Sequence, residues 1–407
     1  MFVTKKIKNG LTVVYEKIPY VKSVSIGVWA GVGSIRENAE NNGISHFAEH
    51  MLFKGTEKRS AKDIAEEMDF IGGHLNAFTS KETTCYYAKV IDKSLETAID
   101  ILSDMYINSK FNSGDIDLER RVILEEISMY EDSPEDVVLD TLAKASWGDN
   151  SLGFAVSGEA EIVENIVRDD LVAFADKYYT AENTVISVTG NFDEENLINL
   201  LEKYFANMRR GKKAEDILPA IFKPGREVRE KDIEQSHIAL AFNGIPYVSD
   251  EIYSEAVLCN VLGGTMSSRL FQKIREEKGL CYSVYSATES FHTNGVFYIY
   301  AGISPENTEK VKEIILEEIE SLKKYGITDY ELKKGKQQLS GSYLLSLESI
   351  GARMNSLGKS TVLGERIKTA DEVMAGIEAV NADSINMIIN KIFSGDYAES
   401  ILKNIQR

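Results

Sequence analysis

Hydrophobic and polar residues follow one order of predicted elements twice along this chain. In the first half, Ser23–Ala30 alternates as a strand, and a helix that carries two histidines follows it. Further helices and strands are predicted over 61–70, 75–80, 83–90, 94–108 and 115–130. The second half repeats this order over 237–242, 250–262, 267–277, 282–290, 295–303, 307–324 and 330–347. We therefore predict an α+β fold with two homologous α/β repeats, each a mostly antiparallel sheet packed with helices.

The joint between the two repeats is a charged stretch that contains Pro219, Pro224 and Gly225. This composition is typical of a surface linker. We expect an N-terminal domain over 1–208, a linker over 209–235 and a C-terminal domain over 236–407. The first residues predict a strand that turns at Asn9–Gly10 into a second strand, and they lack the apolar run of a signal peptide.

Composition narrows the class of protein. Of the 407 residues, 43% are hydrophobic and 27% are charged, and no apolar run is long enough to span a bilayer. The net charge of −18 argues against nucleic acid or an anionic membrane as partner. Three cysteines are too few for a disulfide framework and favour a reducing compartment. A cytoplasmic enzyme or binding protein fits these features.

The predicted motif helix carries His46-Phe47-Ala48-Glu49-His50. On a helix, His46 and His50 share one face, where two imidazoles can hold one zinc ion. Glu49 lies beside them and can take a proton from a water at the metal. This is the H-x-x-E-H order, the inverse of H-E-x-x-H. Gly43 and Ser45 just before the motif predict a turn and an N-cap. The plain alternative is a histidine pair on a solvated surface.

A catalytic zinc site needs a third protein ligand. The segment 118–130 suits a long helix and offers three acids, Glu119, Glu125 and Glu126. Glu119 and Glu126 are two turns apart and share a face, whereas Glu125 falls on a neighbouring face. Spacing leaves all three possible, and an acidic solvated helix is the plain alternative.

The H-x-x-E-H motif followed by the pair Glu119 and Glu126 resembles the pitrilysin/insulinase family of zinc metallopeptidases. Within it, the chain is most similar to the branch of the mitochondrial processing peptidase beta subunit and its bacterial relatives. The resemblance implies that Glu126 is the third ligand of one zinc ion per chain and that Glu119 supports the ligands. It also implies that the strand after Gly72-Gly73 receives the substrate, with the substrate-binding residues Asn76, Ala77 and Phe78.

The second half lacks this set of ligands. Its segment 252–260 contains no histidine, and Lys333 and Ser340 stand where the first half has its acid pair. The remaining histidines, His74, His237 and His292, are expected to be structural. The resemblance implies, however, that Arg275 and Tyr282 help to bind the substrate carbonyl. Their plain alternatives are a solvated helix face and an ordinary strand aromatic.

These features together predict a zinc metalloendopeptidase that cleaves extended or unfolded peptides, with Glu49 as general base. The alternative is a catalytically silent zinc-binding or interaction subunit of a peptidase complex. Relatives with a closed chamber carry four such repeats in one chain. We therefore expect a homodimer that closes a chamber and shares its active site between chains.

Overall fold

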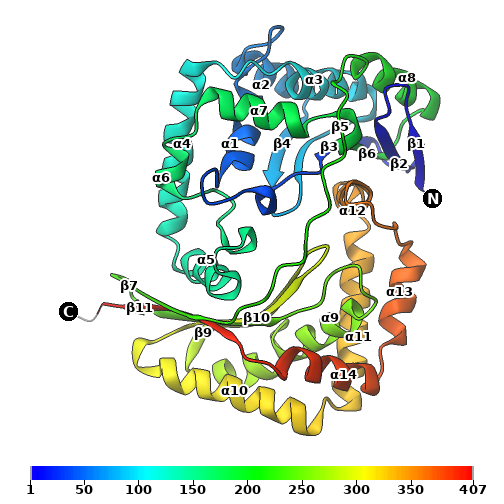
Figure 1. Cartoon of the computed structure of the whole chain (residues 1–407). Helices are drawn as coiled ribbons and strands as arrows, with labels where there is room; N and C mark the ends of the chain where they lie inside the picture. Colours follow the sequence, from blue (N-terminus) through cyan, green and yellow to red (C-terminus); the bar gives the residue numbers. More distant parts are fainter. Residues whose placement is uncertain (1, 406–407) are drawn as a thin grey trace. The chain divides into compact units, whose positions relative to one another are not determined.

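The structure is a computed structural model that describes residues 2–405 (Figure 1). Met1, Gln406 and Arg407, at the ends of the two expected domains, lie outside the described residues. Contacts divide the described chain into two compact units. Unit 1 comprises 2–127, 155–216 and 346–367, and unit 2 comprises 128–154, 217–345 and 368–405. No helix within these residues has the length and apolarity needed to cross a membrane.

Unit 1 is built on a six-stranded sheet. Its strands lie in the order β1 (Phe2–Lys6), β2 (Thr12–Lys17), β6 (Thr184–Gly190), β3 (Ser23–Ala30), β5 (Thr84–Ile91) and β4 (His74–Thr79). All neighbours are antiparallel except β2 and β6. Its helices are α1 (Ile44–Met51), α2 (Ala61–Phe70), α3 (Leu95–Asn108), most of α4 (Ser113–Glu131), α6 (Ala160–Val163), α7 (Arg168–Tyr178), α8 (Glu194–Tyr204) and α12 (Ile350–Val362).

Both faces of this sheet are covered. Ile26 and Val28 of β3 point into the main core, which they share with Phe47 and Met51 of α1. Alternate residues of a strand point to opposite faces, so Trp29 packs on the other side, against α12. A Cβ at Gly358 would lie 2.0 Å from the Trp29 ring nitrogen, so glycine is required for this close approach.

Unit 2 repeats the arrangement with five strands. Their order is β7 (Arg226–Lys231), β11 (Ala398–Asn404), β8 (Ser236–Asn243), β10 (Gly295–Ile303) and β9 (Cys281–Ser290). The β7–β11 pair is parallel and the other pairs are antiparallel. The helices of this unit are α5 (Pro134–Trp147), α9 (Ile252–Leu262), α10 (Thr308–Tyr325), α11 (Asp329–Ser346), α13 (Ala370–Ala379) and α14 (Ala382–Phe393). Apart from the extra edge strand β1, both sheets have one topology, which confirms the predicted α+β fold with two repeats.

The two units exchange a helix, so they do not follow the expected boundaries of 1–208 and 236–407. The helix α5, from the first half of the sequence, packs on β8 and β11 of sheet 2. The helix α12, from the second half, packs on β3 and β6 of sheet 1. Each helix buries an apolar face against a sheet, which stabilises it more than helix propensity does. Within the expected linker, Arg226–Lys231 forms β7 and belongs to sheet 2.

Candidate metal centre

The motif helix α1 begins at a turn that a buried acid holds in place. Gly43 at its N-cap has a φ of 94°, in the left-handed region that favours glycine. Glu37 is buried and accepts hydrogen bonds from the backbone N–H groups of Gly43 at 2.8 Å and Ser45 at 2.9 Å. The first N–H groups of a helix have no partner within the helix. Glu37 therefore caps α1, whereas we expected Ser45 to provide the N-cap.

Three side chains converge on one point between α1 and α4. The Nε2 atoms of His46 and His50 are 3.2 Å apart. Oε2 of Glu126 lies 3.8 Å from Nε2 of His46 and 3.5 Å from Nε2 of His50. Among the described residues these three form the one cluster of three or more histidine, cysteine, aspartate or glutamate side chains suited to a metal. Glu125, which spacing left open, is exposed and outside the cluster.

Glu119, the other acid of the pair, lies on the far side of the His50 ring. Its Oε1 is 2.8 Å from Nδ1 of His50, and its Oε2 forms an ion pair with Lys54. These partners hold the pKa of Glu119 below its usual range against the opposing effect of burial. An acceptor at Nδ1 orients the ring so that its Nε2 faces His46 and Glu126.

Glu49 is buried beside the cluster and faces the sheet. Its Oε2 accepts a hydrogen bond of 2.5 Å from the hydroxyl of Thr79, at the end of β4. The hydroxyl of Thr84 lies 3.4 Å from that of Thr79 and donates to the carbonyl of Val32. One carboxylate oxygen of Glu49 is therefore fixed by the edge strand.

Burial sets the electrostatics of these groups. It lowers the pKa of His46 to about 4, helped by the neighbouring His50, so His46 is neutral at neutral pH. Burial also raises the pKa of Glu49 above its ordinary value, while the Thr79 hydroxyl acts in the opposite direction. A neutral His46 suits metal ligation, and an acid with raised proton affinity suits proton transfer.

The strand expected to receive substrate is β4, which lies at the edge of sheet 1 and pairs only with β5 within the described chain. The N–H of Ala77 is bonded by the side-chain oxygen of its neighbour Asn76, at 2.8 Å. Ala77 packs on the face that carries α1, together with Thr79. Phe78 points to the opposite face, where its ring meets Trp29 edge to face at 5.6 Å. The Phe78 side chain thus packs within the structure, against the far face of the sheet.

Arg275 and Tyr282 belong to unit 2 and lie next to each other. Arg275 lies in the last turn of a short π-helical segment (Phe271–Glu276), and its guanidinium lies 5.1 Å from the Tyr282 ring centroid. Tyr282 is 74% exposed and stands on β9, the edge strand of sheet 2 that corresponds to β4. The structure brings these two residues together as a pair. His237 bonds the hydroxyl of Tyr300 at 2.8 Å, in keeping with a structural role.

Three contributors to the site escape sequence reasoning. Glu37, Lys54 and Thr79 each act through a neighbour that spacing does not reveal. Lys54 carries a weak signal, since it stands one helical turn after His50 and could reach the same acid. Glu37 and Thr79 carry none.

Comparison with known proteins gives consistent results along the whole chain. Residues 12–159 match the model of the insulinase family, peptidase family M16, and residues 165–339 match the M16 inactive domain. A Bacillus subtilis protein named uncharacterized zinc protease YmxG is 44% identical, and the alignment covers 97% of this chain and 96% of that relative. A Rickettsia felis protein named uncharacterized zinc protease is 37% identical, with 98% and 97% covered.

Solved structures share the fold at lower identity. An M16 inactive-domain protein from Pseudomonas fluorescens superposes with a TM-score of 0.93 at 19% identity, covering 100% of this chain and 98% of that one. A protease from Helicobacter pylori gives 0.92 at 22% identity, with 99% of both chains covered. These structures support the two-repeat fold, and the curated relatives carry the sequence similarity over its full length. The chain therefore belongs to the insulinase family, peptidase family M16.

Proposed function

We propose that this chain is a zinc metalloendopeptidase that hydrolyses peptide bonds in extended or unfolded peptides. The observation that carries the proposal is the convergence of His46, His50 and Glu126 beside the buried acid Glu49. A second support is the position of Glu49, which joins this cluster to an open strand edge through Thr79. The names of the relatives agree with this activity.

The ligand set fits zinc. Two imidazoles and one carboxylate are a common set for catalytic zinc, and the two Nε2 atoms face each other with an acid oxygen close to both. We infer one zinc ion per chain, since the counterparts of the acid pair in α11 are Lys333 and Ser340. When bound, zinc polarises the scissile carbonyl and lowers the pKa of a water.

The chain's own groups then handle the proton and the substrate. Glu49 accepts a proton from the attacking water and returns it to the leaving amine. Thr79 holds the Glu49 carboxylate in one orientation, and Glu119 does the same for the His50 ring. Fixed partners of this kind lower the cost of reaching the reactive geometry.

A peptide would bind as an added strand along β4. An edge strand offers backbone N–H and C=O groups that an extended chain can pair with, and a folded protein cannot present such a strand. Ala77 is the central position for pairing with a substrate strand. In the structure its backbone N–H donates to the side-chain oxygen of Asn76. We infer that Asn76 turns away when substrate binds and then bonds the substrate, while Phe78 anchors the strand through its contact with Trp29.

Assembly completes the proposal. We infer a homodimer that encloses a chamber, in which Arg275 and Tyr282 of one chain serve the zinc site of the other. The exposed Tyr282 ring on an open edge strand, with Arg275 against it, supports a role in binding the substrate carbonyl. A symmetric dimer would bury two such pairs.

A catalytically silent subunit is the alternative, and one structural neighbour is described as an M16 inactive domain. The intact set of His46, Glu49, His50 and Glu126 disfavours it, because a silent subunit has no need of a buried acid beside the ligands.

One experiment tests the activity. A quenched peptide should be cleaved by the protein as purified with zinc, and a chelator should abolish cleavage until zinc is restored. Glu49→Gln should keep one zinc per chain and lose turnover, which separates the base from the ligands. Full turnover in Glu49→Gln, or cleavage that the chelator leaves unchanged, would contradict the proposal.

A further inference from the structure

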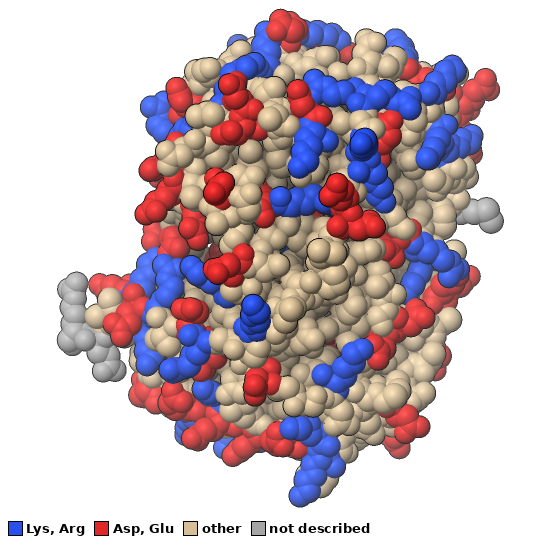
Figure 2. Space-filling view, viewed as in Figure 1, with Lys and Arg blue, Asp and Glu red and all other residues tan. Residues whose placement is uncertain are grey.

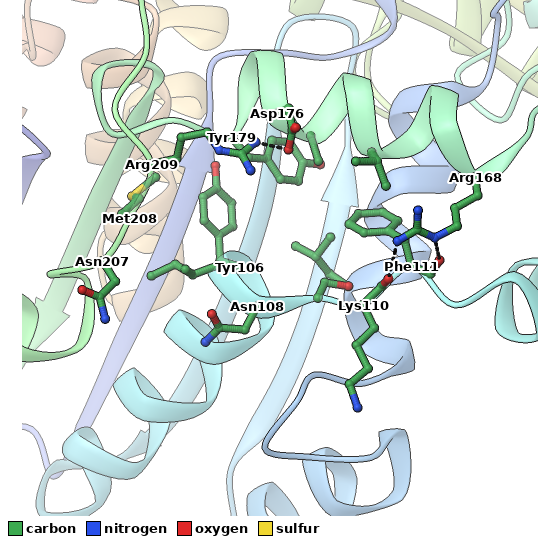
Figure 3. Close-up of a pocket in the computed structure, with 15 residues that line it drawn as sticks. Tyr106, Asn108, Lys110, Phe111, Arg168, Asp176, Tyr179, Asn207, Met208 and Arg209 are labelled. Atoms are coloured by element: carbon green, nitrogen blue, oxygen red, sulfur yellow. Dashed lines mark hydrogen bonds and ion pairs between the residues drawn. The ribbon is translucent and has the colours of Figure 1, made fainter.

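Unit 1 contains a cavity that is separate from the metal centre. It has a volume of about 400 Å³ and lies between the end of α3, the helix α7 and residues 207–209 (Figure 3). Neither the proposed metal ligands nor Glu49 line it. Its size is within the range of small-molecule sites in proteins.

The charge of the lining is opposite to that of the chain. The cavity is lined by Lys110, Arg168 and Arg209 against the single acid Asp176, although the whole chain carries −18. Figure 2 shows Lys and Arg side chains gathered over the region that α7, α8 and the following segment occupy in Figure 1. An excess of positive charge around a cavity favours an anionic ligand.

Of the three cations, Arg168 is the best anchor. Asp176 already forms an ion pair with Arg209, and Lys110 lies 3.4 Å from Glu57. The nearest acid to Arg168 is the exposed Asp169, at 3.9 Å, and the guanidinium otherwise donates to backbone carbonyls. An Arg guanidinium presents several donors in one plane and can bind a carboxylate or phosphate with two of them.

Aromatic and aliphatic side chains form part of the cavity lining. Tyr106 and Tyr179 stack there, with ring centroids 5.0 Å apart and planes inclined by 12°. The other buried apolar residues of the lining are Leu52, Phe111 and Met208. In Figure 3, Arg168 and Phe111 lie toward one end and the two tyrosines lie toward the Arg209 end. An inorganic ion would leave these apolar side chains without a contact, whereas the apolar part of an organic anion can pack against them.

The backbone at the rim is strained. Phe111 has a φ of 48° and is the one non-glycine residue of the described chain with a positive φ. The Nε–H of Arg168 donates to the carbonyl of Phe111 at 2.8 Å and holds this conformation. Such a backbone costs on the order of 1 kcal/mol or more and is found chiefly where function requires it. The strain sets the Phe111 ring and the Arg168 guanidinium at the same end of the cavity.

We propose that this cavity binds a small organic anion. Its carboxylate or phosphate group pairs with Arg168, and its apolar part packs against the apolar side chains of the lining. The site adjoins the end of the motif helix, because Leu52 lines the cavity and the hydroxyl of Ser109 donates to the carbonyl of Met51 at 3.2 Å. Binding itself needs neither metal nor substrate, so it can be tested apart from the proposed peptidase activity.

Four probes test the proposal by isothermal titration calorimetry on the full chain: benzoate, phenyl phosphate, inorganic phosphate and benzamide. We expect one-to-one binding of benzoate, phenyl phosphate or both. The ratio of the two Kd values shows whether the site prefers a carboxylate or a phosphate. Inorganic phosphate should bind at least about tenfold more weakly than phenyl phosphate, and uncharged benzamide should not bind. Saturable binding by neither aromatic anion would overturn the proposal. Equal binding of benzamide, or of inorganic phosphate, would overturn it as well.

Three variants locate the site. Arg168→Gln should weaken binding at least about tenfold, since a charged hydrogen bond is lost. Ala175→Phe fills the cavity and leaves every charge in place, so it should abolish binding even if Arg168→Gln fails to fold. Arg229→Gln is the matched control, because the side chains of Arg229 and Arg168 are both 46% exposed and Arg229 lies in unit 2. Unchanged binding in a folded Ala175→Phe protein would place the ligand elsewhere.

Discussion

Glu119 and His50 are joined by a hydrogen bond of 2.8 Å on the side of the imidazole that faces away from Glu126. One turn of α4 thus touches Nδ1 of His50, and a position two turns further on approaches its Nε2. Glu119 thus lies at one ring nitrogen of His50, and Glu126 lies near the other. We propose that Glu126 binds a metal together with the histidines and that Glu119 orients His50.

Glu119→Gln tests this division. The amide keeps the size of the side chain but loses the ion pair with Lys54 and weakens the bond to His50. Loss of such an outer partner lowers metal affinity by about 10–100-fold. Zinc affinity can be measured by competition with a chromogenic chelator, with the exposed Asp117→Asn as a control on the same helix. An affinity equal to that of the unaltered protein would show that Glu119 does not support His50.

Two variants of neighbouring residues, Glu126→Gln and Glu125→Gln, test which acid of α4 is the third metal ligand. Glu126→Gln should lose zinc to a greater extent than Glu119→Gln, because it removes a charged ligand. Glu125→Gln, one residue away, should retain one zinc per chain, since Glu125 is exposed and outside the cluster. Metal content after dialysis, measured by atomic absorption, distinguishes the two. Zinc loss in Glu125→Gln with retention in Glu126→Gln would reverse the assignment.

Thr79→Val probes the base. Valine has nearly the shape of threonine but cannot donate to Glu49, so the carboxylate loses a hydrogen bond of 2.5 Å. A hydrogen bond to a charged group contributes about 1.5–3 kcal/mol, and we therefore expect kcat to fall by about tenfold or more with zinc content unchanged. Steady-state cleavage of the quenched peptide measures this. An unchanged kcat would mean that other contacts hold Glu49.

Some of this site could be predicted from the sequence and some could not. The spacing of His46 and His50 predicted that they share one face of a helix with Glu49 beside them, and the structure confirms the helix. Spacing alone did not choose among the acids, because helical geometry tells which residues share a face and not which face meets α1. Glu37 and Thr79 reach the motif through folding of the chain, so nothing local reveals them.

The fold shows the same limit. The hydrophobic pattern predicted the core strand Ser23–Ala30 with its observed ends, because a buried strand has a strong pattern. The pattern of α12 shows an apolar face but does not name its partner, which is the sheet of the other repeat. The short strand Arg226–Lys231 is almost entirely exposed and charged, and for this reason it was expected to be linker.

Stability should depend on pH through Glu255, which is buried in α9. Burial raises its pKa from 4.5 to about 7, against the opposing hydrogen bond from the N–H of Ile245. The folded chain keeps this proton at pH values where the unfolded chain releases it. The contribution therefore favours folding at low pH and is lost as pH rises from 4.5 through 7.

Glu255→Gln should remove this dependence, because the amide is neutral at all these pH values. We expect the variant to be more stable than the unaltered protein at pH 8 by up to about 3 kcal/mol, with a smaller difference at pH 5. Urea unfolding at pH 5, 6, 7 and 8 measures it, with the exposed Glu313→Gln on α10 as control. Glu255 would be ionised in the folded state if the variant were less stable than the unaltered protein at pH 8. The same would follow if the two unfolding free energies differed by the same amount at every pH.

The shared active site can be tested by mixing two impaired proteins. Glu49→Gln lacks the base, and Tyr282→Phe lacks the hydroxyl that we propose to bind the substrate carbonyl of the partner chain. If Tyr282 acts across the dimer, each mixed dimer contains one complete site, with Glu49 from one chain and Tyr282 from the other. An equal mixture forms mixed dimers as half of its dimers, so activity should return to about a quarter of the unaltered value, in addition to the residual activity of Tyr282→Phe. If Tyr282 acts within its own chain, no site in the mixture holds both groups. Subunit exchange is checked with chains that carry different fluorophores. Exchange without recovered activity would rule out the shared site and leave the zinc assignment intact.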